Sequence, residues 1–407
     1  MPSSRPVVPL GADCFRHDPG IHHRACSATI GKLAAPGANR FSLSTLLQIV
    51  PRVPGGIDGV GDYALTIAQK LRDQIGCDTL FATFKPSFPE NAAGFEVLPL
   101  DSLLDDIHQK YDHVLLHYVN YGFQKRGIPF RLLSILRALR KRRHGKLITI
   151  FHELYDSGPP WTSAFWLQPL QIHLAKSVGR LSDACIASND SFRREVQRLV
   201  PNAHVELHPV PSGLGEPALS FNQIAGRDPH WWTIIGGTAL TERSLRWFRQ
   251  ILSLIPEAIA PRKLVVLGGE DNPVTRSLLA DLAVESDYHP CVAALDASEI
   301  LKTCSFALFD YFRDLDVETS MILKSSAFAS ACAHGVIPIL PYCKSKVSVA
   351  EVAQPGPFFI DQKNCELPAA ADRATVAFQI YEWYQRYAHS NQLVGGITRL
   401  MELSPEP

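Results

Sequence analysis

Short apolar runs alternate with amphipathic segments from about residue 41 onward. Runs rich in aliphatic and β-branched residues predict strands, and apolar positions with helical spacing predict helices. Their alternation is typical of βαβ units built on a parallel sheet. In the first half of the chain, the predicted strands are 46–50, 79–84, 95–98, 113–119, 146–151, 184–187 and 205–208, and the predicted helices are 60–74, 130–143, 167–180 and 191–199.

A stretch rich in proline and glycine, residues 208–217, interrupts this pattern and is typical of a linker. A second series follows, with strands predicted at 232–235, 264–267, 306–309 and 336–340 and helices at 244–254, 275–283, 298–302, 325–334 and 371–389. No strand follows the last helix, so we expect it to pack across the domain junction. The chain therefore divides into a poorly ordered or loosely docked extension (1–40), two α/β domains (41–215 and 216–375) and a C-terminal helix with a tail (376–407).

Composition supports this division and excludes several classes of protein. A chain of 407 residues with 46% hydrophobic residues can bury two cores. Basic and acidic residues both number 40, so no overall charge favours nucleic acid, and we expect none as a partner. The nine cysteines form no CxxC pair, and neither a membrane-spanning run nor a signal-peptide pattern is present. We expect reduced thiols and a cytoplasmic location.

Four glycines fall within residues 54–64, between the first predicted strand and its helix. Glycine lets the backbone approach a ligand, and a helix N-terminus attracts phosphate. Gly59, Gly61 and Ala64 also match the dinucleotide fingerprint G-x-G-x-x-G/A. However, Asp62 would place a carboxylate against a pyrophosphate, which makes a nicotinamide dehydrogenase the least favoured function. A purely structural glycine turn is the alternative.

His152 and Glu153 directly follow the predicted strand 146–151, so we expect them at the rim of a cleft. A histidine there can bind a sugar hydroxyl or a phosphate, and its proton can exchange near neutral pH. A structural histidine that caps the loop is the alternative. Tyr118 and Asn120, after the preceding strand, are further candidates for the same rim.

Two segments of the second half suit a diphosphate. Gly237 ends a predicted strand and Arg243 follows it, so a guanidinium would lie near a glycine turn. Further on, Lys324 precedes Ser325 and Ser326, which are candidate N-caps of a helix rich in small residues. An exposed arginine and an ordinary capped helix are the respective alternatives.

A basic cluster ends the helix predicted at 130–143. Most such runs are solvated faces, but docking on an anionic membrane leaflet is an alternative that would place the protein at the inner face of the membrane. Nucleic acid is disfavoured because no aromatic residue interleaves with the charges. The cluster consists of Arg137, Arg140, Lys141, Arg142, Arg143 and Lys146.

Four segments in this order resemble bacterial GT-B glycosyltransferases of the large retaining family 4, also called group 1: residues 55–63, residues 151–153 with 158–161, the spacing Gly237-x5-Arg243, and residues 324–338. The resemblance implies the α/β GT-B fold, in which two Rossmann-like domains turn their parallel sheets toward a central cleft. It further implies that the N-terminal domain holds the acceptor and the C-terminal domain holds a nucleotide-diphosphate sugar.

The resemblance also implies roles for the matching residues. His152 would contact the transferred sugar, and Arg243 and Lys324 would stabilise the departing diphosphate, so these three are the expected catalytic residues. Transfer would proceed with retention and would need no metal or other cofactor. The expected donor-binding residues are Gly59, Gly61, Gly237, Ser325, Ser326 and Glu318, and the acceptor-side candidates are Asp62, Tyr118, Asn120 and Glu153.

One departure from the family pattern keeps other functions open. The usual E-x7-E pair is missing, because its places fall on Ile322 and Ser330, and Glu318 could serve the loop only in a shifted register. Three hypotheses follow: a transferase acting on a glycan or lipid-linked acceptor in polysaccharide biosynthesis, a catalytically impaired scaffold or partner subunit, and a sugar-nucleotide isomerase or hydrolase.

Overall fold

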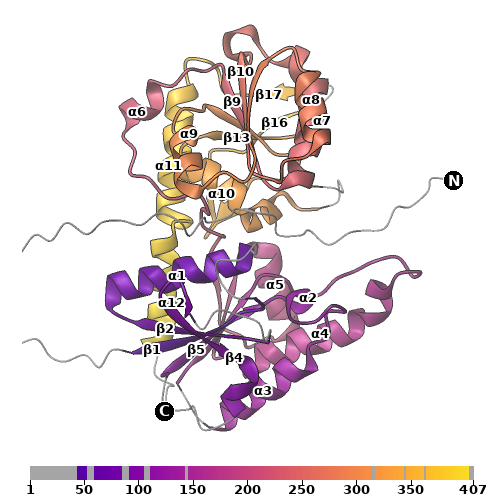
Figure 1. Cartoon of the computed structure of the whole chain (residues 1–407), viewed down its shortest axis with the longest axis vertical. Helices are drawn as coiled ribbons and strands as arrows, with labels where there is room; N and C mark the ends of the chain where they lie inside the picture. The colour runs from indigo at the N-terminus through magenta and orange to yellow at the C-terminus, as the bar shows by residue number, and fades with distance from the viewer. Residues whose placement is uncertain are drawn as a thin grey trace, which may run out of the picture.

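The computed structural model describes residues 44–52, 59–84, 91–104, 111–142, 145–312, 317–342, 345–361 and 364–402. The predicted N-terminal extension, residues 53–58 of the glycine loop, Arg143 and the end of the tail lie outside these ranges. The described residues form two α/β domains, one above the other in Figure 1. The predicted pair of α/β domains with parallel sheets is thereby confirmed.

The N-terminal domain is built on a sheet of eight described strands in the order β3-β4-β2-β1-β5-β6-β7-β8, parallel except for the β3–β4 hairpin. Its strands are β1 (Thr45–Ile49), β2 (Asp78–Thr83), β3 (Asn91–Ala92), β4 (Phe95–Pro99), β5 (His113–Tyr118), β6 (Leu147–Phe151), β7 (Ala184–Ala187) and β8 (Val205–Leu207). Its helices are α1 (Gly59–Ile75), the 3₁₀ helix η1 (Leu100–Leu104), α2 (Asn120–Phe123), α3 (Phe130–Lys141), α4 (Ser163–Leu181) and α5 (Asp190–Leu199).

The C-terminal domain has a sheet of seven described strands in the order β11-β10-β9-β12-β13-β16-β17 and a separate β14–β15 hairpin. The strands are β9 (Trp231–Ile235), β10 (Lys263–Leu267), β11 (Glu285–His289), β12 (Phe306–Leu308), β13 (Ile337–Leu340), β14 (Ser348–Val349), β15 (Val352–Ala353), β16 (Phe358–Ile360) and β17 (Cys365–Glu366). The helices are α6 (Phe221–Ala225), α7 (Thr238–Ile251), η3 (Leu252–Leu254), η4 (Glu257–Ile259), α8 (Pro273–Ala280), α9 (Ala294–Leu301), η5 (Thr319–Lys324), α10 (Ser326–Ala333), α11 (Arg373–Tyr387) and α12 (Ser390–Glu402).

The central strands form where nearly all residues can be buried on both faces of the sheet. All five residues of β6 and all four of β13 are buried, as expected for central strands of a sheet covered on both sides. Helix α1 buries Tyr63, Ile67 and Leu71, which recur every four residues along one face. These elements hold the carboxyl ends of the strands in fixed positions.

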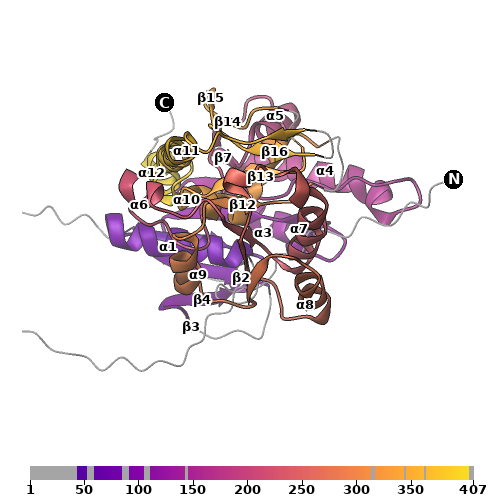
Figure 2. The ribbon, with the colours of Figure 1, turned by 90° about the horizontal axis from the view of Figure 1, so that it is seen from above.

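The C-terminal end of the chain returns to the N-terminal domain. Helix α11 packs in the C-terminal core, whereas Leu393, Ile397 and Leu400 of α12 pack against the N-terminal sheet. Figures 1 and 2 show the two helices following one another along the side of the molecule. The sequence predicted one helix over 371–389 and a tail. The structure instead breaks the helix near residue 388 and uses a second helix for the crossing.

A buried carboxylate ties this crossing to the linker. Glu216 accepts hydrogen bonds from the Tyr384 hydroxyl (2.7 Å), from the Ser390 backbone N–H (2.7 Å) and from the Ser390 hydroxyl. The ammonium of Lys70, on α1, lies 3.4 Å from the same carboxylate. Linker, C-terminal helices and N-terminal domain therefore meet at one charged, hydrogen-bonded point.

Other differences from the predicted elements have simple physical causes. Strand β11 was missed because its sequence, ESDYH, is polar and occupies a sheet edge. Helix α7 begins six residues before the predicted start at 244, because Gly237 rather than a later residue is its N-cap. Within the described ranges, every helix is too short or too polar to span a lipid bilayer.

Candidate functional site

Residues that follow the carboxyl ends of strands in the two sheets contact one another, as the pairing of Lys324 with Phe192 shows. In the N-terminal sheet β1 lies between β2 and β5, and in the C-terminal sheet β9 lies between β10 and β12. Strand order reverses at both places, and ligands of open α/β sheets bind in the crevice at such points. The loops after β6, β9 and β12 therefore border one cleft between the domains.

His152 is held by a chain of hydrogen bonds at this cleft. Its Nε2 lies 3.1 Å from Nδ1 of His117, and Nε2 of His117 lies 2.8 Å from Oε1 of Gln48. Since the amide oxygen accepts, His117 carries its proton on Nε2, and its Nδ1 accepts from Nε2–H of His152. The ring of Tyr63 meets the His152 ring edge-on, with centroids 4.9 Å apart. The orientation and tautomer of His152 are thus fixed.

Burial keeps this histidine pair neutral. It lowers the pKa of His152 to about 3, with a further contribution from the Lys324 charge, and it also holds the pKa of His117 well below its usual value. The sequence suggested proton exchange near neutral pH at His152. The structure overturns this expectation, because an imidazolium would be desolvated and would face a cation. His152 is suited to hydrogen bonding rather than to acid catalysis.

Lys324 reaches the cleft from the C-terminal domain. Its ammonium lies 4.5 Å from the centroid of the Phe192 ring, on α5 of the N-terminal domain. Burial lowers the pKa of Lys324 and raises that of Glu153, while the attraction between the two charges opposes both shifts. Among the described residues, no carboxylate lies within ion-pair distance of the Lys324 ammonium. The cleft therefore contains a desolvated cation available to an anionic ligand.

The two serines that follow Lys324 differ in their surroundings. Ser325 is buried, and its hydroxyl caps α10 by accepting from the backbone N–H of Phe328 at 3.2 Å. Ser326 is exposed on the first turn of the helix, and a side-chain carbon at Gly213 of the linker would lie 3.8 Å from its Cβ. Only Ser326 presents its hydroxyl at the open N-terminus of the helix.

Arg243 supports the loop after β12. Its guanidinium donates to the backbone carbonyls of Asp310 and Tyr311, the latter at 3.0 Å, and its Nε lies 3.6 Å from the Asp310 carboxylate. Burial raises the pKa of Tyr311 to about 12, while the Arg243 charge opposes the shift and the Glu153 charge adds to it. Charges from both domains, Arg243 and Glu153, thus act on Tyr311. Gly237 is the N-cap of the helix that carries Arg243.

The remaining predicted residues are distributed differently. Gly59, Gly61 and Asp62 form the first turn of α1, next to the Tyr63 ring that contacts His152. Tyr118 and Asn120 are buried in the N-terminal domain and do not line the cleft. The Tyr118 ring instead packs in the core against Phe151.

Glu318 bridges the domains. Its carboxylate accepts from the Ser191 hydroxyl and lies 2.9 Å from Nη2 of Arg194, both on α5. The Ser191 hydrogen bond, more than any other contact, lowers the pKa of Glu318. The carboxylate is therefore already paired across the cleft, at a partly exposed position.

Sequence reasoning missed Gln48, His117 and Phe192. The sequence did contain a pattern that indicated the first two. Gln48 and His117 are polar residues that directly follow a pair of leucines in the strands TLLQI and HVLLHY. Buried polar side chains need partners, so each indicated a neighbour across the sheet. The contact between Phe192 and Lys324 joins separate domains and left no trace in the sequence.

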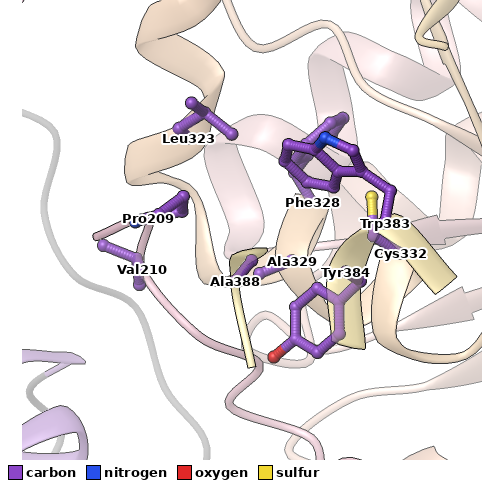
Figure 3. A pocket seen from close by; sticks show the side chains of 9 residues that line it. All are labelled: Pro209, Val210, Leu323, Phe328, Ala329, Cys332, Trp383, Tyr384 and Ala388. Carbon is purple, nitrogen blue, oxygen red and sulfur yellow. The ribbon is translucent and has the colours of Figure 1, made fainter. Parts of the chain in front are cut away.

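A small apolar cavity lies beside this site, where the linker meets α10 and α11 (Figure 3). It offers no charged group for a phosphate, and we regard it as a packing gap at the domain junction. Its lining consists of Pro209, Val210, Leu323, Phe328, Ala329, Cys332, Trp383, Tyr384 and Ala388.

Comparison with known proteins identifies the fold. No family model and no curated protein matches the sequence. Among solved structures, an alpha-glucosyltransferase in complex with UDP and a 13-mer DNA containing a HMU base matches with a TM-score of 0.54 at 12% identity, covering 89% of this chain and 100% of that chain. The chain has the GT-B fold.

Two further structures with this fold match over similar lengths. One is described as trehalose-6-phosphate from E. coli bound with UDP-2-fluoro glucose, with a TM-score of 0.51, 9% identity and coverage of 89% of this chain and 100% of that one. The other is AviGT4, a glycosyltransferase involved in Avilamycin A biosynthesis, with a TM-score of 0.51, 12% identity and coverage of 88% and 97%. At these identities the likeness establishes the GT-B fold alone.

Among the described residues, no group of three or more histidine, cysteine, aspartate or glutamate side chains could hold a metal ion. Independence from metal and from other cofactors stays a prediction.

Proposed function

We propose that this protein is a glycosyltransferase that moves a sugar from a nucleotide-diphosphate sugar to a hydroxyl group of an acceptor, with retention of configuration. The observation that carries the proposal is Lys324, a half-buried cation held between the domains of a GT-B fold beside His152. A bound diphosphate would form an ion pair with the Lys324 ammonium, which has no carboxylate within ion-pair distance among the described residues. The solved structures with UDP or a UDP-sugar in the same fold support this choice of ligand class.

The proposed reaction is a substitution at the anomeric carbon. The bond from this carbon to the diphosphate oxygen breaks, a bond to the acceptor oxygen forms, and the acceptor proton passes to the departing diphosphate. Lys324 and the N–H groups at the start of α10 would stabilise the charge that grows on the diphosphate. Arg243, which fixes the loop at Asp310 and Tyr311, would add a second positive charge.

Neutral His152 would bind a sugar hydroxyl. Its Nε2–H is committed to His117, so the Nδ1 atom is left as a hydrogen-bond acceptor. Such a group positions the sugar without exchanging a proton during the reaction. Gly59 and Gly61, at the first turn of α1, would border the same ligand, in line with their predicted donor-binding roles.

The proposed acceptor is a lipid-linked or polysaccharide intermediate bound by the N-terminal domain in the cytoplasm. Glu153 and Asp62 are its candidate contacts, because both lie on the N-terminal side of the cleft. A hexosyl donor is the class we propose to test first, since solved structures with the same fold contain UDP-glucose or UDP-2-fluoro glucose.

The test is a binding and turnover measurement on the full chain. We expect one of UDP, GDP, ADP or dTDP, or a sugar conjugate, to bind and to raise the melting temperature. Lys324→Ala should weaken this binding by about tenfold or more, because it removes a charge-assisted contact worth roughly 1.5 to 3 kcal/mol. Lys302→Ala is the matched control, since Lys302 precedes β12 at the far end of the sheet. No binding of any nucleotide to folded protein would refute the proposal.

A specific observation favours a second candidate, a GT-B scaffold without catalysis. Ile322 and Ser330 occupy the places of the family's glutamate pair, and both are buried. The Ser330 hydroxyl donates to the Ser326 carbonyl at 2.8 Å and accepts from Ser212 at 3.0 Å. Nucleotide binding without turnover on any acceptor would favour this candidate, and free sugar or a new sugar nucleotide formed without acceptor would indicate a hydrolase or an isomerase.

A further inference from the structure

The N-terminal end of α4 carries a cluster of exposed apolar side chains. Trp161, Phe165, Trp166 and Leu170 are 72%, 40%, 70% and 41% exposed, and we call these four residues the aromatic tip. Figures 1 and 2 both show the first turns of α4 and the preceding loop extending away from the N-terminal domain. The rings of Phe165 and Trp166 pack edge to face with centroids 5.3 Å apart. The tip is thus an ordered apolar projection.

Helix α4 packs on the domain through its later turns. Gln171, Leu174 and Val178 are buried against the N-terminal core. Trp166 and Leu170 precede Leu174 at intervals of four residues, but they belong to the earlier turns and are exposed. Two tryptophan side chains that are exposed together at one end of a helix commonly mark a surface that binds a membrane or another protein.

The charged residues of α4 itself are all basic. Arg180 lies on the helical face of Trp166, and Lys176 lies on the face of Phe165. Residues 157–182 contain no aspartate or glutamate. Asp156, just before this segment, donates its backbone N–H to the Gln171 side chain at 2.8 Å. The outer face of α4 is therefore aromatic at its beginning and basic toward its end.

A neighbouring loop extends the basic surface. Residues 113–152, which include α3, also contain no aspartate or glutamate. The Gln171 side chain donates to the backbone carbonyl of Arg126 at 3.0 Å, so the exposed residues Lys125 and Arg126 lie next to α4. An acidic protein partner would pair with the basic side chains but would not bury the tryptophan rings. An anionic lipid surface would do both.

We propose that the aromatic tip inserts into the interface of an anionic lipid bilayer, with Lys125, Arg126, Lys176 and Arg180 contacting the headgroups. Tryptophan is favoured at the boundary between headgroups and acyl chains, and each basic residue near an anionic leaflet contributes about 1 kcal/mol. This inference does not depend on the proposed activity.

The basic cluster considered in the sequence analysis is a separate candidate for membrane contact, and two of its arginines have partners within the domain. Arg140 forms two hydrogen bonds with Asp183, at 2.8 and 3.1 Å. Arg142 donates to the Leu104 carbonyl at 2.8 Å. These two guanidiniums therefore contribute to contacts within the domain.

The experiment measures co-sedimentation of the full chain with vesicles of phosphatidylcholine alone and of phosphatidylcholine with 30% phosphatidylglycerol (a test condition of about one anionic lipid in three). We expect binding to the anionic vesicles and at least tenfold weaker binding by the double variant Trp161→Ser, Trp166→Ser. Leu295→Ser is the control, because Leu295 is 79% exposed on α9, in the other domain. Lys176→Glu with Arg180→Glu should weaken binding to anionic vesicles while leaving the tip in place.

Each contrary outcome identifies a different role for the tip. No binding by folded wild-type protein, or equal binding by the tryptophan variant, would overturn the proposal. Self-association that the tryptophan variant abolishes, without vesicle binding, would make the tip an interface between two copies. Binding to a DNA or RNA oligonucleotide in place of vesicles would equally overturn it. Because the altered side chains are exposed, we expect all variants to retain the wild-type melting temperature within a few degrees.

Discussion

His117 and His152 form a direct imidazole–imidazole hydrogen bond, Nδ1 to Nε2, of 3.1 Å. His117 is fully buried and is anchored in turn by Gln48, whereas His152 borders the cleft. The buried His117 thereby fixes the orientation of the His152 side chain, which follows the carboxyl end of β6. His117 acts as a positioning residue, because it contacts the cleft only through His152.

We predict that His117→Leu lowers stability and impairs the site at a distance. The substitution leaves Nε2–H of His152 and the Gln48 carbonyl without their partner, at a cost of about 1 to 3 kcal/mol each. Denaturant unfolding measures the loss. Nucleotide affinity, which depends on Lys324, should change by less than threefold, while any transferase turnover should fall by more than tenfold. A fall in affinity as large as that in turnover would contradict a positioning role.

The electrostatic link between Lys324 and His152 gives a second prediction. In Lys324→Met, the pKa of His152 should rise, because a neighbouring positive charge is removed. It should stay below 6.5, since burial is the larger cause of the lowering. Histidine ring signals followed by NMR through a pH titration measure this change. An unchanged pKa would mean that the two side chains do not share the cleft.

Stability should fall as the pH drops below about 6.5. His334 is fully buried, it donates from Nδ1 to the Ser330 carbonyl, and burial lowers its pKa to about 4. The unfolded chain binds the proton first, so stability is complete above pH 6.5 and declines toward pH 4, by roughly 2 kcal/mol between pH 7.5 and 5. The lowered pKa values of His117 and His152 act in the same direction, and the raised pKa values of Glu153 and Asp310 act against it.

Denaturant unfolding at several pH values checks this prediction. His334→Gln should have a flatter pH dependence than the wild type, whatever its stability at neutral pH. An equally steep dependence in the variant would assign the effect to other groups.

Glu216→Ala should destabilise the domain junction strongly. The substitution leaves the Tyr384 hydroxyl and the Ser390 N–H and hydroxyl without their acceptor, and it leaves Lys70 beside no carboxylate at that point. Breaking a buried charged network of this kind costs about 3 to 5 kcal/mol. The melting temperature should fall, and proteolysis between α11 and α12 should become faster. Glu216→Gln, which keeps one acceptor oxygen, should lose less.

Substitutions at Glu318 and Arg194 can show whether Glu318 only bridges the two domains or also binds the donor. Both side chains are more than half exposed, 54% and 60%, so their ion pair should contribute less than about 1 kcal/mol. If Glu318 only bridges the domains, Glu318→Gln and Arg194→Ala should have similarly small effects on nucleotide affinity. If it contacts the donor, as predicted from the sequence, Glu318→Gln alone should reduce that affinity by more than tenfold in calorimetric titration.

The sequence by itself determined the two α/β domains and the approximate place of most central strands. Continuous apolar runs such as LITIF can be buried only in the middle of a sheet, whatever the rest of the chain does. It also located His152 directly after a strand and Lys324 directly before a helix, because the carboxyl ends of parallel strands share one edge. It placed Arg243 at the start of its helix, whereas the structure places it in the second turn of α7.

Only the tertiary structure decided what these residues can do. The packing of His117 against His152, the contact of Lys324 with Phe192 and the pairing of Glu318 with Arg194 join segments far apart in the chain. Such contacts depend on how two domains and two sheets are placed in space, and local propensity carries no information about that placement. The neutrality of His152 follows from the same cause, since burial and a neighbouring cation exist only in the folded chain.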